Sequence, residues 1–131
     1  MSSDTDLKKG EMPMKFKVVF HVNTDADGPF QTACLNILNM LKDTEVIEYG
    51  ADIILLLNGP GILKLKNDAN RKDLDAADLL AKKGVKFQIC NNSLIKFELS
   101  KDDMHPSCEV VPAGVMALIK LQADGYAYIK P

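Results

Sequence analysis

The stretch VKFQICNNS at residues 85–93 is the strongest indication of the fold in this sequence. Its opening run, VKFQIC, is typical of a buried strand. The residues that follow, Asn91, Asn92 and Ser93, are types that cap the N-termini of helices, so we expect a short helix to begin there. A buried strand that leads directly into a helix is the repeating unit of a parallel α/β sheet.

The same alternation of strand and helix runs along the rest of the chain. Strands are predicted at residues 15–22, 53–57, 85–90, 108–111 and 126–129, and helices at residues 29–43, 74–83 and 113–124, with short helices near 62–66 and from residue 91. Crossovers of this length join parallel neighbours. We therefore predict a three-layer α/β/α sandwich with a mainly parallel five-stranded sheet, formed by residues 14–131 as one domain. Residues 1–13 lack apolar periodicity and are predicted to be a disordered tail.

Composition and charge limit the partners that the chain can have. Sixteen basic and eighteen acidic residues give a net charge of -2, so the positive field that binds a phosphate backbone is missing and nucleic acid is not an expected partner. The longest uncharged apolar run, residues 53–57, is too short to cross a bilayer, and the N-terminal stretch is polar rather than signal-like. We expect a cytoplasmic protein that does not associate with membranes.

The three cysteines, Cys34, Cys90 and Cys108, form no C-x-x-C pair and no His/Cys spacing suited to zinc, so neither a disulfide framework nor a metal site is predicted. Cys90 ends a predicted strand just before a predicted helix, where free N–H groups and the helix dipole lower the pKa of a thiol. A thiolate nucleophile or persulfide carrier is one interpretation of this position, and simple packing of a buried cysteine is the other. Cys34 is predicted to pack in the core, and packing or modest exposure is the favoured interpretation of Cys108.

Further residues, most of them polar, lie where the predicted strands end. They are Asn23, Asn58, Gly59, Asn91, Asn92 and Ser93. Ligands of parallel α/β sheets bind in the crevice beyond the carboxyl ends of the strands, so these are the expected binding residues. His21 lies near the same edge and His105 lies in a loop, but the sequence assigns a role to neither.

The predicted last helix, residues 113–124, is apolar almost all round. A helix of this kind must be buried on both faces, either deep in the fold or against another subunit. In so small a domain a subunit interface is the favoured interpretation, and we expect a homo-oligomer.

Four segments together resemble the DsrE/DsrF-like (YchN-like) family. They are KVVFHV at 17–22, NGPGI at 58–62, CNNSL at 90–94, and the stretch that runs from VVPAGV at 110–115 to LQADGYAYIKP at 121–131. The likeness covers about residues 15–131. It implies a small α/β fold with a parallel five-stranded sheet, assembly into trimers or hexamers, and intracellular sulfur transfer.

In the best understood members of this family a cysteine after the third strand relays sulfur as a persulfide, and Cys90 is the residue in that position here. The resemblance therefore implies that Cys90 is the catalytic residue and that the partners are sulfur donor and acceptor proteins, with no cofactor. Two other hypotheses stay open. One is a non-catalytic module that binds a small ligand between Asn23, Asn58 and Asn92, and the other is a structural oligomer.

Overall fold

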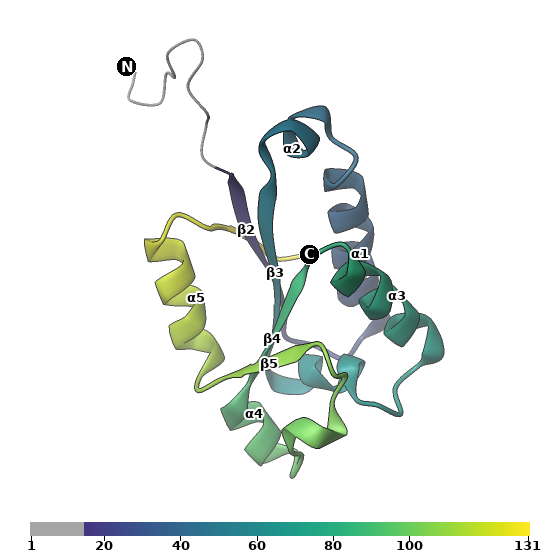
Figure 1. The fold of residues 1–131 in the computed structure, drawn as a ribbon. Helices are drawn as coiled ribbons and strands as arrows, with labels where there is room; N and C mark the ends of the chain where they lie inside the picture. Colours follow the sequence, from purple (N-terminus) through teal and green to yellow (C-terminus); the bar gives the residue numbers. More distant parts are fainter. Residues whose placement is uncertain (1–14) are drawn as a thin grey trace.

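The structure is a computed structural model that describes residues 15–131. The tail predicted at residues 1–13 lies outside the described residues. A five-stranded sheet forms the middle of the molecule, with the strand order β5-β4-β3-β2-β6 and parallel pairing between all neighbours (Figure 1). Its strands are β2 (Phe16–Val22), β3 (Ala51–Leu57), β4 (Lys86–Cys90), β5 (Cys108–Val111) and β6 (Ala127–Ile129). The predicted parallel five-stranded sheet is confirmed.

Helices cover both faces of this sheet. They are α1 (Asp27–Met40), α2 (Thr44–Tyr49), α3 (Arg71–Lys82), α4 (Asn91–Lys96) and α5 (Gly114–Ala123), with the 3-10 helices η1 (Gly59–Leu65) and η2 (Lys101–Asp103). Figure 1 shows α1 and α3 on one side of the sheet and α5 on the other, which is the predicted three-layer arrangement. Within residues 15–131, no helix has both the length and the apolar character that spanning a membrane requires.

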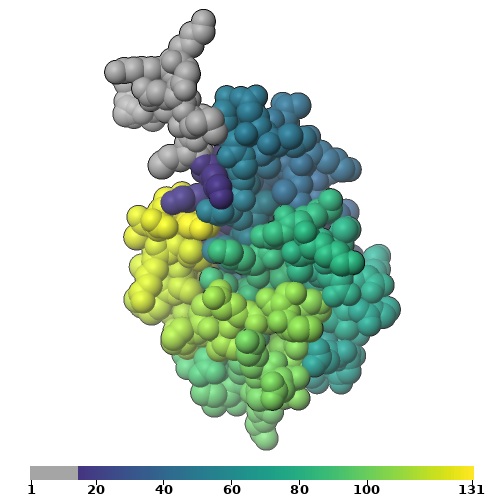
Figure 2. Space-filling view, in the orientation of Figure 1, coloured from purple at the N-terminus to yellow at the C-terminus, as the bar shows by residue number. Residues whose placement is uncertain are grey.

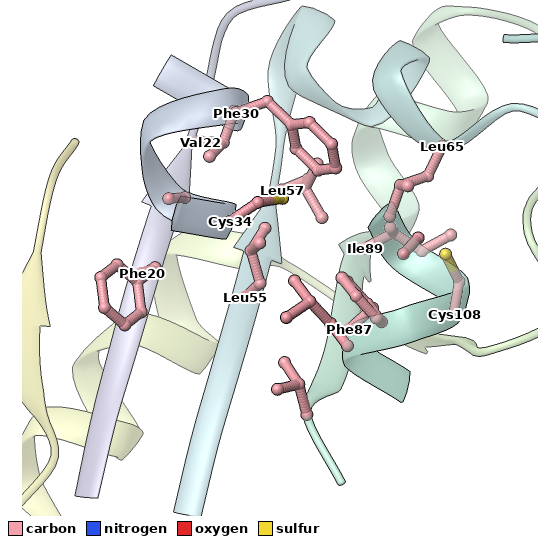
Figure 3. Packing of buried hydrophobic residues seen from close by; sticks show 14 of the residues in the cluster. Phe20, Val22, Phe30, Cys34, Leu55, Leu57, Leu65, Phe87, Ile89 and Cys108 are labelled. Carbon is pink, nitrogen blue, oxygen red and sulfur yellow. The ribbon is translucent and has the colours of Figure 1, made fainter. Parts of the chain in front are cut away.

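The alternation of side chains along the strands divides the core unequally between the two faces. The larger cluster faces α1 and α3, and Figure 3 shows part of it, including Phe20, Val22, Leu55, Leu57, Phe87 and Ile89. On the opposite face Val19, Ile54 and Leu56 meet Leu118 of α5 in a much smaller cluster. The helix α5 therefore covers its face of the sheet with few apolar contacts.

The structure differs from the predicted elements between α1 and β3. The sequence predicted one helix over residues 29–43, but α1 ends at Met40 and a second helix, α2, follows. The Asp43 carboxylate caps α2 by accepting the N–H of Glu45 at 2.8 Å. No residue of α2 is buried, so this helix lacks the apolar periodicity by which a helix is detected in a sequence.

A buried lysine fastens η1 to both helices of the larger layer. Lys64 Nζ lies 2.7 Å from Asp27 Oδ1 in α1 and 3.2 Å from Asp73 Oδ2 in α3. Burial alone would lower the pKa of Lys64, but the hydrogen bonds to the two carboxylates outweigh burial and raise that pKa. The lysine therefore stays charged and paired, which fixes the segment after β3 against α1 and α3.

The segment after β3 also packs tightly against the end of β2. A Cβ atom on Gly61 would lie 2.3 Å from the carbonyl oxygen of Val22, so only glycine fits there. The N–H of Asn58 donates to the same carbonyl at 3.2 Å. Together these contacts hold η1 across the carboxyl end of β2.

Replacing Gly61 with alanine is expected to destabilise the fold by more than about 2 kcal/mol, because the new methyl group would overlap the Val22 carbonyl and force the two backbones apart. Gly28→Ala in α1 is the matched control. A Cβ atom at Gly28 meets nothing within 4 Å, so this variant should keep the native stability or gain up to ~1 kcal/mol. Urea denaturation gives the free energy of unfolding for both variants, and equal values would contradict the close contact.

Candidate functional site

Cys90 occupies the junction between β4 and α4. It is the last residue of the strand and the N-cap of the helix. Phe87 and Ile89 point into the larger core cluster, so the alternation of the strand turns Cys90 to the opposite face, where α5 lies. Cys90 is 5% exposed and, among the described residues, belongs to neither apolar cluster. Cys90 therefore lies at the carboxyl end of the sheet, outside both apolar clusters.

Several N–H and O–H groups stabilise the thiolate form of Cys90. Burial opposes the charge, but it is outweighed by hydrogen bonds that the thiolate receives from the Ser93 hydroxyl and from the backbone N–H groups of Gly114, Ser93 and Asn92. The pKa of the Cys90 thiol is lowered as a result. Asn92 and Ser93 belong to the first turn of α4 and Gly114 opens α5, so two helix N-termini converge on the sulfur.

Ser93 links the surroundings of the Cys90 sulfur to the segment after β3. Its buried Oγ accepts the N–H of Gly59 at 2.7 Å. Because the oxygen serves as the acceptor in that bond, the hydroxyl hydrogen remains available for Cys90. Gly59 has a φ of 55°, in the left-handed region that glycine adopts without strain. The predicted residues Gly59, Ser93 and Cys90 are therefore brought together.

Asn58, which directly follows β3, lies close to Cys90 and to Gly114, the first residue of α5. A Cβ atom on Gly114 would lie 3.4 Å from Cβ of Cys90 and 3.4 Å from Nδ2 of Asn58. The three residues meet at one point, although they come from β4, from the end of β3 and from α5. The missing side chain of Gly114 is what allows this close approach.

His21 supports Asn58 from the neighbouring strand β2. Its Nε2 lies 2.8 Å from Asn58 Oδ1, and its Nδ1 lies 2.6 Å from the Tyr128 hydroxyl of β6. Because an amide oxygen can only accept, Nε2 carries the hydrogen and Nδ1 accepts from Tyr128. Burial is the main cause that lowers the pKa of His21; the hydrogen bond to Asn58 opposes this shift and the charge of Lys130 adds to it. The ring is therefore neutral at neutral pH.

The other predicted binding residues lie at the same edge with different contacts. Asn23 Oδ1 accepts from Lys130 Nζ at 2.9 Å, which ties the end of β2 to the segment after β6. Asn92 is exposed and offers its backbone N–H to Cys90. The Asn91 side chain forms no hydrogen bond with another described residue. The expectation that Asn91, Asn92 and Ser93 cap α4 was wrong, because the helix begins directly after the strand and Cys90 takes the N-cap position.

The other two cysteines are core residues, as predicted. Figure 3 shows Cys34 and Cys108 among the side chains of the larger cluster. Burial is the main cause that raises the pKa of each thiol to about 12. Cys34 is 5% exposed, as is Cys90, so hydrogen bonding rather than exposure distinguishes the two thiols.

His105 lies away from this group of residues. Its Nε2 is 2.6 Å from Asp78 Oδ1 of α3, and its Nδ1 accepts the N–H of Ser107 at 3.1 Å. These contacts, together with 6% exposure, indicate that His105 holds the loop before β5 against α3. It is a structural residue.

Three hollows on the described surface lie away from Cys90. One of about 180 Å³ lies between α1 and α3, one of about 530 Å³ lies beside α1, α2 and β2, and one of about 420 Å³ lies beside β4 and β5. None of these three is lined by Asn23, Asn58 or Asn92. Residues 15–131 contain no cluster of three or more side chains suited to binding a metal ion.

Sequence reasoning missed the part that Gly114 and Tyr128 take in this site. Tyr128 reaches His21 only because β6 pairs with β2, and the positions of strands along a chain do not reveal their order in a sheet. No signal in the sequence points to it. For Gly114 the sequence does contain a signal, because a glycine that opens a helix just after a strand allows other residues to approach closely.

Comparisons with known proteins give one family. The model of the DsrE/DsrF-like family matches residues 17–131. A solved structure of a protein of unknown function, MTH1491 from Methanobacterium thermoautotrophicum, is 27% identical and superposes with a TM-score of 0.81, covering 89% of this chain and 100% of that chain. The crystal structure of the ychN protein from E. coli is 11% identical with a TM-score of 0.70, covering 88% and 99%, which is a likeness of fold. No curated protein matches the chain.

Cys90 is expected to be the fastest thiol to react at neutral pH. Iodoacetamide labelling followed by peptide mass spectrometry should modify Cys90 first, because burial raises the pKa of Cys34 and Cys108 to about 12 while hydrogen bonds lower that of Cys90. The labelling rate should rise with pH as the thiolate forms, with a midpoint below that of an ordinary cysteine. Equal labelling of all three thiols in the folded protein would refute this expectation.

The Ser93→Ala variant should move the labelling midpoint of Cys90 to higher pH, because the thiolate loses the donor that lowers its pKa most. Ser107→Ala is the matched control, since Ser107 contacts His105 and not Cys90. The pH dependence of the labelling rate measures both variants. A midpoint that stays in place in Ser93→Ala would show that the hydroxyl does not act on the sulfur.

Proposed function

The chain belongs to the DsrE/DsrF-like family, and from this membership we propose that it is an intracellular sulfur-transfer protein that carries sulfane sulfur as a persulfide on Cys90. The resemblance seen in the sequence is confirmed at the level of the family, by the match over residues 17–131. The chemistry assigned to Cys90 is the further step of the proposal. It includes a cytoplasmic setting, where thiols such as its three free cysteines stay reduced.

The observation that supports the proposal most is the set of donors around the Cys90 sulfur. A sulfur carrier needs a thiolate that attacks and a bound persulfide that persists, and both are anions. The Ser93 hydroxyl and the N–H groups of Gly114, Ser93 and Asn92 favour the first of these anions, the thiolate on the Cys90 sulfur. Cys34 and Cys108, which lie in apolar surroundings, lack this support.

The transfer that we propose needs neither an oxidant nor a cofactor. The Cys90 thiolate attacks the outer sulfur of a donor persulfide; a new S–S bond forms as the S–S bond of the donor breaks, and the donor leaves as a thiolate. In the second step an acceptor thiolate attacks the outer sulfur on Cys90, which returns Cys90 to its thiolate form. The partners are therefore proteins that present a persulfide and a thiolate.

We further propose that α5 joins copies of this chain into a homo-oligomer, a trimer or hexamer. Val115, Met116 and Ile119 are 61%, 47% and 53% exposed on its outer side. Figure 2 shows the C-terminal part of the chain as one flank of the molecular surface. Apolar side chains gathered in this way are typical of an interaction surface.

Incubation with a sulfane-sulfur donor should add one sulfur atom to the native protein, and peptide mass spectrometry should place that atom on Cys90. Cys90→Ser should take up none while keeping its fold, because the swap is nearly isosteric. A variant with both Cys34→Ala and Cys108→Ala is the control that keeps Cys90 alone, and it should load like the native protein. Loading of Cys90→Ser to the native level would overturn the proposal.

Sedimentation at micromolar concentration should show no major monomer in the native protein. Ile119→Asp should release monomers, because a carboxylate on the outer side of α5 would have to be buried in the interface. Ile47→Asp on α2, at a residue that is 71% exposed, is the matched control and should leave the assembly intact. A native protein that sediments as a monomer would contradict this proposal.

A further inference from the structure

The contacts of Asn58 point to a role that rests on the proposed function and extends it. We propose that the Asn58 side-chain amide binds the outer sulfur of the Cys90 persulfide, and that His21 and Tyr128 are positioning residues that hold the amide in the orientation this requires.

The inner sulfur atom already has its own donors. Ser93, Gly114 and Asn92 act on the sulfur of Cys90 itself, and Asn58 is not one of these groups. A persulfide places a second sulfur about 2 Å beyond the first. This outer atom bears the negative charge of the persulfide anion, so a donor placed for it would stabilise the loaded state.

Asn58 Nδ2 is a free donor in the right neighbourhood. It lies 3.4 Å from the position that a Cβ atom of Gly114 would occupy, and Cβ of Cys90 lies at the same distance from that position. Asn58 Oδ1 is engaged by His21, while Nδ2 has no hydrogen-bond partner within residues 15–131. The NH₂ group is therefore left available for an atom beside Cys90 and Gly114.

The orientation of the amide depends on a chain of two hydrogen bonds. An asparagine side chain that turns by half a rotation exchanges its oxygen and its nitrogen, which would present an acceptor to the sulfur. With the Asn58 oxygen facing Nε2 of His21, the neutral ring donates from Nε2 and its Nδ1 accepts from the Tyr128 hydroxyl, so a half-turn of the amide would require the ring tautomer and the Tyr128 hydroxyl to change with it. His21 is 9% exposed, so water competes little for these bonds.

The test measures the exchange of one sulfur atom between glutathione persulfide and the protein. Intact-mass spectrometry measures the fraction of Cys90 that carries the persulfide at equilibrium with glutathione and glutathione persulfide. This fraction gives a partition constant, the equilibrium constant for transfer of the sulfur atom from glutathione persulfide to Cys90. We expect this constant to fall about tenfold in Asn58→Ala, as for the loss of one hydrogen bond to a charged group, and about threefold in Tyr128→Phe, where the amide is only loosened. The pH midpoint for alkylation of the unloaded thiol should keep its native value in both variants.

Tyr49→Phe removes a hydroxyl from α2 and is the matched control, which should partition like the native protein. If the native protein takes up no sulfur, the proposed function is wrong, and this inference is wrong as well. If the native protein loads, the inference alone is overturned when either Asn58→Ala or Tyr128→Phe keeps the native constant, or when the alkylation midpoint shifts along with it. Tyr128 is 39% exposed and loses only its hydroxyl, so this arm does not depend on how Asn58→Ala folds.

Discussion

The close packing of Gly61 against the carbonyl oxygen of Val22 is the contact on which the arrangement of the sulfur site depends. Because no side chain fits between these backbones, the segment after β3 lies directly across the end of β2. Asn58 is thereby set against His21, and the same segment reaches α4 on its other side. The ion pairs of the buried Lys64 fix the far end of η1. A loop that would otherwise be free to move thus becomes a rigid bridge between a histidine and a cysteine on strands that are not neighbours.

The two faces of the sheet differ in the residues that they carry. The face toward α1 and α3 holds the larger apolar cluster, and the two cysteines within it have thiols that stay protonated. The face toward α5 has a much smaller cluster, and it is there that Cys90 and His21 project from the strand ends. The alternation of side chains separates the main apolar core from the polar residues at the strand ends, so these residues do not interrupt that core.

Features that depend on local sequence were predictable, whereas those that depend on strand order were not. The position of Cys90 follows from a buried strand that runs into a helix, and the burial of Cys34 follows from its place on an apolar helix stripe. The partner of His21 could not be predicted, because Tyr128 reaches it only through the pairing of β6 with β2. The helix α2 escaped detection because it buries no residue, and its one local signal, the Asp43 cap, was assigned to the end of α1.

The pairing of β6 with β2 also has a consequence for the order in which the molecule folds. The hydrogen bond between His21 and Tyr128 joins residues 107 positions apart, so the entropy of closing a long loop opposes it until the rest of the sheet has formed. β6 spans three residues, all exposed, and adds little burial of its own when it docks. We therefore expect β6 to pair after β2 to β5 have formed the rest of the sheet, so that the hydrogen bond between Tyr128 and His21 is among the last contacts beside Cys90 to form.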